Sequence, residues 1–121
     1  MKKLLLIFSV MLLVCSFNSE ASTLTKRGGV NWYGGVKETW YDLPMKKVCE
    51  YAYNETFLNE EEHPYWVRDD GVKMIGEYVM CAADFDYAPR GTIVETSLGT
   101  GVVCDTGDMT GAWIDIAVDW K

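Results

Sequence analysis

The chain has 121 residues, a formal net charge of −7 and an apolar fraction of 49%. This length suits one domain built around a single hydrophobic core. The excess of acidic residues opposes binding to nucleic acid and to anionic membrane surfaces, because both carry negative charge. The composition therefore predicts a globular protein without a nucleic-acid partner.

The first 21 residues have the pattern of a secretory signal peptide. Two lysines precede an apolar run, and small residues follow at Ser19 and Ala21. This pattern predicts cleavage after Ala21 and export to the cell wall or the medium. The apolar run is too short for a confident membrane span, so no stable membrane insertion is expected after cleavage. A lipid anchor on Cys15 is the alternative, but Val14 stands where a smaller residue normally precedes a lipidated cysteine.

The first half of the mature chain contains few strand signals. Residues 22–35 are rich in Gly, Ser and Thr, a composition that predicts a flexible lead-in before a single domain at residues 36–121. An extended segment then ends at Leu43-Pro44, because proline disfavours helix in the residue before it. Residues 46–57 fit one face of a short helix, although two alternating tyrosines among them also fit a strand.

The second half is dominated by strand and turn signals. Residues 65–75 predict two short strands about an Asp-Gly turn, and residues 77–84 predict another strand. Residues 92–105 have the clearest hairpin pattern, with two β-branched runs around a Gly-containing turn. Residues 112–120 predict a closing strand with alternating faces. This half is therefore expected to form a small β barrel or sandwich.

The cysteines and the histidine do not indicate a metal site. Cys49, Cys81 and Cys104 remain after cleavage, and an odd number in an exported chain allows at most one disulfide, whose pairing stays open. The only histidine, His63, lies in an acidic loop that is expected to be solvated. Neither a zinc site nor a Ser-His-Asp arrangement fits this pattern, so no metal and no cofactor are expected.

The stretch VVCDTG, which ends in Asp105-Thr106-Gly107, has the form of an aspartic-peptidase loop. Such a peptidase needs two of these loops, so that two carboxyl groups share one proton. This chain has one loop, and a homodimer of short protomers would need a flap and further strands after it. Only 14 residues follow Gly107. These are too few, and the peptidase interpretation is rejected.

The same stretch is the middle one of three spaced blocks. The first runs from Asp84 to Thr92 (DFDYAPRGT), the second is Asp105-Thr106-Gly107, and the third is Ile114-Asp115. Their order resembles the 3D domain, named for three aspartates in a double-psi β-barrel. That domain occurs in membrane-bound lytic transglycosylase A and in small secreted cell-wall proteins of bacteria. The resemblance covers residues 83–121; Asp108 departs from it, since the family usually has glycine there.

The resemblance implies a mainly β fold, a six-stranded double-psi β-barrel with one or two short helices. It also implies cleavage of the glycan strands of peptidoglycan without a cofactor. In this reaction one carboxyl group acts as acid and then as base, because the sugar's own hydroxyl attacks the anomeric carbon. By resemblance Asp105 is this group, and Asp84 and Asp115 orient it and raise its proton affinity. Thr106, Gly107 and Trp113 are expected to bind the substrate.

Two alternatives remain open at the level of sequence. A non-catalytic module on the same barrel would bind wall glycan or another protein, and the small size of the chain favours it. Each aspartate also has a structural explanation: Asp84 and Asp105 as turn caps, and Asp115 as a solvent-facing strand residue. In both cases the protein is expected to act as a monomer.

Overall fold

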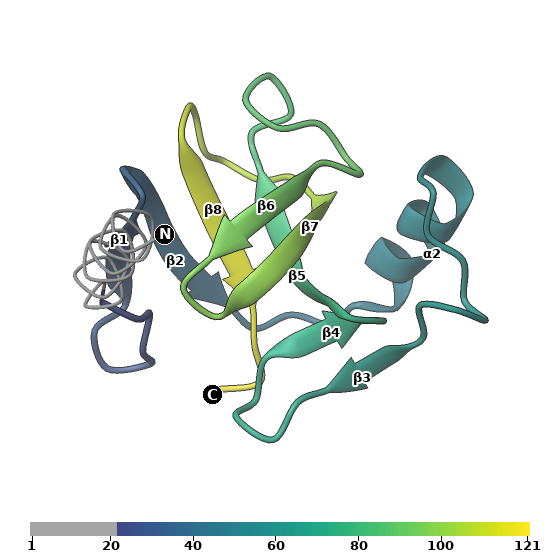
Figure 1. Cartoon of the computed structure of the whole chain (residues 1–121), viewed down its shortest axis with the longest axis horizontal. Coiled ribbons are helices and arrows are strands. Elements are labelled where there is room, and N and C mark those ends of the chain that lie inside the picture. Colours follow the sequence, from purple (N-terminus) through teal and green to yellow (C-terminus); the bar gives the residue numbers. More distant parts are fainter. Residues whose placement is uncertain (1–21) are drawn as a thin grey trace, which may run out of the picture.

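The computed structural model describes residues 22–121, and the predicted signal peptide, with Cys15, lies outside the described residues. The described chain is mainly β with a single helix (Figure 1). Its elements are β1 (Val30–Tyr33), β2 (Val36–Tyr41), α2 (Lys46–Glu55), β3 (Tyr65–Val67), β4 (Lys73–Ile75), β5 (Tyr78–Ala83), β6 (Ile93–Thr96), β7 (Gly99–Asp105) and β8 (Trp113–Ala117). The predicted mainly β class is therefore confirmed.

All the strands belong to one mixed, unclosed sheet of eight strands. The main order is β1-β2-β8-β5-β4-β3, and β7 joins it through β5 and carries β6 on its other edge. Two pairings are parallel, β2 with β8 and β5 with β7, and the others are antiparallel. Parallel partners need a crossover connection, and the pairing of β2 with β8 connects the two halves of the chain.

Strand β5 is the strand on which the others converge. It pairs with β7 along one edge and with β4 and β8 along the other. Because its edges and both its faces are covered, it is a continuous apolar run in which residues 79–83 are all buried. Val79 and Cys81 face one core cluster, and Met80 faces a second cluster that also contains Cys49 and Ala52 of α2.

Helix α2 covers the second core cluster and confirms the predicted helix. Its buried residues, Cys49 and Ala52, are three positions apart and so lie on one helical face, which excludes the alternative of a strand. The helix ends where Thr56 donates both its backbone N–H and its hydroxyl to the carbonyl of Ala52. Within residues 22–121, no helix has the length and apolarity needed to cross a membrane.

Both predicted hairpins are present. β3 and β4 pair antiparallel around the Asp70-Gly71 turn, and β6 and β7 pair around Ser97 and Leu98. Gly71 has a φ of +88°, a conformation that suits glycine, and a Cβ there would lie 2.8 Å from the Trp120 ring. The turn residues therefore act as the sequence predicts.

Residues 22–35, for which the composition predicts a flexible lead-in, instead form part of the fold. Leu24 is 2% exposed and belongs to the first core cluster. The carboxylate of Glu38, 1% exposed, accepts hydrogen bonds from the Asn31 side chain and from the backbone and hydroxyl of Ser97. Composition misleads here because one apolar residue, Leu24, and one amide, Asn31, attach this segment of small residues to the core.

We expect Gly101→Ala to destabilise the fold by about 2 kcal/mol, the usual range for overpacking. A Cβ at this β7 position would lie 2.7 Å from Sγ of Cys81 and 3.1 Å from the carbonyl oxygen of Val79. Chemical denaturation measures the loss. Gly107→Ala is the control, because its Cβ would approach only Met109, at 3.5 Å. Equal stabilities of the two variants would contradict the close packing of β5 against β7.

Candidate functional site

Four side chains form a row across four neighbouring strands. Ala82 of β5 lies opposite Asp105 of β7 on one edge and opposite Asp115 of β8 on the other. Asp115 in turn lies opposite Thr39 of β2. Residues that are directly opposite in neighbouring strands point to the same face of a sheet. We call these four residues the aspartate row.

A β-bulge directs Asp105 into this row. The register of β5 with β7 shifts between Cys81, which is opposite Val103, and Ala82, which is opposite Asp105. One extra residue, Cys104, is thereby accommodated in β7. If the register did not shift, Ala82 would lie opposite Cys104 and not opposite Asp105. Bulges often redirect a side chain beside a functional site.

The small side chain of Ala82 separates the two carboxyl groups. Two strand spacings of about 4.8 Å lie between the backbones of Asp105 and Asp115. A methyl group does not screen one carboxyl group from the other. Accordingly, burial is the main factor that raises the pKa of Asp115, and the charge of Asp105 raises it further. Asp115 therefore holds its proton more tightly than an exposed aspartate does.

Asp115 is held by a chain of hydrogen bonds. The hydroxyl of Thr39 donates to Oδ1 of Asp115 at 2.8 Å, and the indole N–H of Trp113 donates to that hydroxyl at 2.7 Å. The hydrogen bond from Thr39 lowers the pKa of Asp115 and partly offsets the effect of burial. The ammonium group of Lys37 lies 4.0 Å from the centre of the Trp113 ring. These contacts fix the orientation of the Asp115 carboxyl group.

Tyr41 adds a phenol to the same face, since it follows Thr39 by two positions in β2. Its hydroxyl is buried and has no hydrogen-bond partner within the described residues. Burial raises the pKa of Tyr41 most, and the charges of Asp105, Cys81 and Asp115 raise it further, so the phenol stays protonated. A buried donor without a partner next to two carboxyl groups is a position at which a water molecule or a ligand group would bind.

Asp84 has a different task from the other two aspartates. Its Oδ1 accepts the backbone N–H of Asp86 and its Oδ2 accepts that of Gly111, each at 3.0 Å. The first bond closes the turn after β5, and the second holds the loop that leads into β8. The structure thus brings Asp105 and Asp115 together, and Asp84 joins two loops beside them without a hydrogen bond to the aspartate row.

The three predicted substrate-binding residues lie around the loop after β7. Gly107 and Trp113 line a depression of about 380 Å³, together with Asp108, Met109 and Thr110. Thr106 does not line it; its backbone N–H donates to Oδ1 of Asp105 at 2.9 Å. The depression therefore adjoins Asp105 along the chain but is lined by the loop and not by the aspartate row.

The other chemistry-bearing residues are buried. Cys49, Cys81 and Cys104 are free thiols, and burial is the main cause that raises the pKa of Cys104 to about 12, which leaves it unreactive. Within residues 22–121, no group of three or more His, Cys, Asp or Glu side chains is placed to hold a metal ion.

The prediction that His63 is solvated is wrong. The residue is 9% exposed, its ring stacks on Tyr78, and its Nδ1 accepts the N–H of Asn59. The acidic loop folds back against Gly76, where a Cβ would lie 2.8 Å from the His63 ring. The histidine therefore serves packing.

Sequence reasoning missed Thr39, Tyr41 and Ala82. Thr39 and Tyr41 are two positions apart in an extended segment, which indicates that they share one face of a strand. The alternation does not indicate which strand lies beside it. Their place beside Asp115 depends on the parallel pairing of β2 with β8, two strands from opposite ends of the chain.

Comparisons with known proteins do not add to this picture. No family model, no curated protein and no solved structure matches the chain. The case for a function therefore rests on the residues and the geometry of the site.

We expect Asp115→Asn to raise the melting temperature at pH 7 by roughly 2–4 °C and to change it little at pH 3. The folded pKa lies above the unfolded value, so the folded state binds the proton more tightly and loses stability as the pH rises between the two values. Asparagine keeps an acceptor for Thr39. About 1 kcal/mol shifts the midpoint of such a domain by roughly 4–8 °C, and solvent screens a half-buried carboxyl group. A shift of equal size at both pH values would contradict this assignment.

Tyr41→Phe should stabilise the protein by about 1 kcal/mol in urea denaturation at pH 7, because it removes a buried hydroxyl that lacks a hydrogen-bond partner in the described part of the chain. Tyr53→Phe is the matched control: its hydroxyl donates to the carbonyl of His63 at 2.6 Å, so its loss should destabilise. If both variants lose stability equally, the Tyr41 hydroxyl has a partner in solution.

Proposed function

We propose that the mature chain is an exported protein that acts on peptidoglycan and cleaves its glycan strands with an aspartate acid/base. The observation that carries this proposal is the aspartate row. Two carboxyl groups share one face with a buried phenol that has no hydrogen-bond partner among residues 22–121, and the pKa of Asp115 is raised. Carboxyl groups with altered proton affinity are the usual catalysts of glycosidic bond cleavage.

A double-psi β-barrel is the fold that we propose for this chain. Its support is the spacing of the three aspartate blocks together with the two parallel pairings, β2 with β8 and β5 with β7. These pairings bring strands that are distant in sequence around a shared core, as an interlocked barrel requires. The pairings of β5 with β7 and with β8 put the second and third blocks on either side of the strand that precedes the first.

The proposed reaction uses Asp105 first as an acid. It protonates the oxygen of the scissile glycosidic bond, that bond breaks, and the sugar's own C6 hydroxyl attacks the anomeric carbon. Asp105, now ionised, takes the proton of that hydroxyl, which restores the enzyme without a water molecule. Burial raises the pKa of Asp115 and the charge of Asp105 raises it further, so Asp115 can hold a proton beside Asp105. Tyr41 offers its hydrogen bond to the bound sugar or to a carboxylate.

The depression beside the row supports a carbohydrate substrate. Trp113 lines it, and its indole is held in place by Thr39 and Lys37. A fixed aromatic ring offers an apolar surface on which a sugar ring stacks. The negative charge of the chain opposes anionic polymers such as nucleic acid, which leaves wall glycan as the polymer that suits an exported protein.

One observation favours a second candidate, a wall-binding module without catalysis. The depression is lined by Gly107 and Trp113 but by neither Asp105 nor Asp115, and Asp108 adds a further carboxylate to it. A glycan bound there by stacking alone would not need the acid/base pair. Retention on insoluble peptidoglycan without released product would support this candidate.

Asp105→Asn should lower product formation at least about 100-fold, the lower end of what an acid/base group contributes. Residues 22–121 are incubated with purified peptidoglycan, and anhydro-muropeptides are counted by mass spectrometry. Asp119→Asn is the matched control, because this exposed residue follows β8 and has no side-chain hydrogen bond in the described chain. A blank trace for both wild type and Asp105→Asn contradicts the enzyme proposal.

A further inference from the structure

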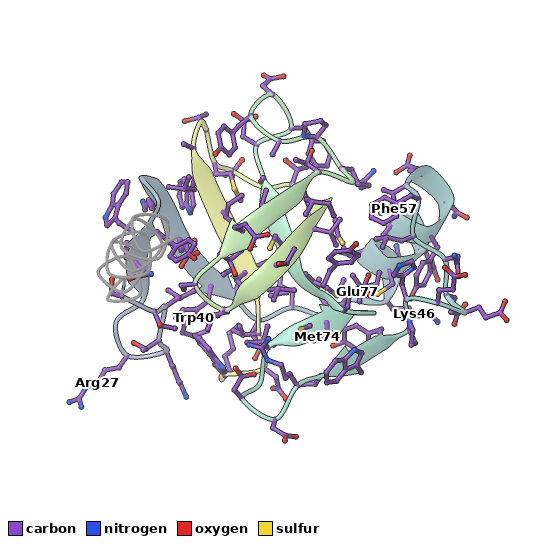
Figure 2. The ribbon with its side chains drawn as sticks, viewed as in Figure 1. Arg27, Trp40, Lys46, Phe57, Met74 and Glu77 are labelled. Carbon is purple, nitrogen blue, oxygen red and sulfur yellow. The ribbon has the colours of Figure 1, made fainter. Side chains whose placement is uncertain are left out.

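A second depression, of about 460 Å³, lies between helix α2 and strand β3 and shares no lining residue with the aspartate row. Its wall carries the thiol of Cys49, the rings of Tyr53 and Tyr65, and the charged side chains of Lys46, Glu50 and Glu60. Figure 2 shows Lys46 in the region between α2 and β3. A cavity of this size takes a small molecule.

The helix supplies most of this wall in a regular pattern. Lys46, Cys49, Glu50 and Tyr53 occupy positions i, i+3, i+4 and i+7 of the helix and so share one helical face. The opposite wall comes from the chain between α2 and β3. The Tyr53 hydroxyl donates to the carbonyl of His63 at 2.6 Å, which ties the helix to that segment. The pocket is therefore fixed by backbone and side-chain contacts.

The charges in this pocket lack internal partners. Within residues 22–121, the ion pairs involve other residues, and none engages Lys46, Glu50 or Glu60. Both glutamates lie close to the same thiol, since their charges, after burial, raise the pKa of Cys49. The pocket thus contains the carboxylates of Glu50 and Glu60 near the thiol of Cys49. The ammonium group of Lys46 belongs to the helical turn before Glu50.

We propose that this pocket binds the head group of an amino acid that ends an aliphatic stem. The ammonium group of the ligand would lie between Glu50 and Glu60, its carboxylate would pair with Lys46, and its stem would pack between the two tyrosines. An anionic ligand would face two carboxylates, and an apolar ligand would remove water from three charges without replacing it. Charge complementarity therefore selects a zwitterion.

Diaminopimelate is a suitable probe because it carries such head groups on an aliphatic stem and occurs in peptide stems of peptidoglycan. The relevance to peptidoglycan rests on the proposed function, but binding of the probe does not. Two matched molecules test the charges: pimelate, which lacks both ammonium groups, and cadaverine, which lacks both carboxylates. We expect each to bind at least tenfold more weakly than diaminopimelate.

The test is titration of isotope-labelled residues 22–121 with each molecule, followed by amide NMR. Diaminopimelate should shift the amide signals of Tyr53 and Tyr65 in a saturable way. Glu60→Gln and Lys46→Met, both at exposed positions, should each raise the dissociation constant about tenfold. Absence of saturable shifts, or equal binding of pimelate or cadaverine, overturns the proposal. Asp105→Asn should bind like wild type, so a failure of the glycan reaction stays distinguishable from a failure of this site.

Discussion

The central constraint of this structure is the position of β5, which is hydrogen-bonded along both edges, to β7 on one and to β4 and β8 on the other. A strand held in this way cannot slip, because a shift of one residue would turn its core side chains to the other face. The fixed register is what places Asp105 and Asp115 on either side of Ala82. The bulge at Cys104 then matters as much as the aspartates themselves, because it decides which side chain of β7 enters the row.

Buried polar groups are treated differently in two parts of the molecule. Glu38 is more deeply buried than Asp115, yet its carboxylate receives three hydrogen bonds from Asn31 and Ser97. Tyr41, in contrast, buries a donor without a partner in the described chain. Proteins usually satisfy such groups, and they accept local destabilisation where a site needs it. The contrast supports a functional interpretation of the Asp105–Asp115–Tyr41 group, since the same fold satisfies its other buried carboxylate.

The sequence predicts features that depend on neighbouring residues. The helix, both hairpins and the alternating faces of the closing strand follow from periodicity and turn residues, and the aspartate spacing singles out Asp105 and Asp115. Features that depend on distant residues are missed: the pairing of Thr39 with Asp115, the bulge at Cys104, and the place of Leu24 in the core. For Asp84 the sequence predicts the position near the other two aspartates but not the role. The spacing does not indicate that its carboxylate joins two loops.

The α2–β3 pocket is connected to the strand that carries Asp105 through the second core cluster. Cys49, on the wall of the α2–β3 pocket, packs in the same cluster as Cys104, which directly precedes Asp105. Helix α2 also contacts β7 directly. Interiors are closely packed, so a displacement of one wall is transmitted to its neighbours. A ligand that draws Lys46 and the two glutamates together would therefore press on the helix face that supports the bulge. If both proposals hold, Cys49 and Cys104 of the second core cluster link the pocket that recognises an amino-acid head group to the strand that carries Asp105.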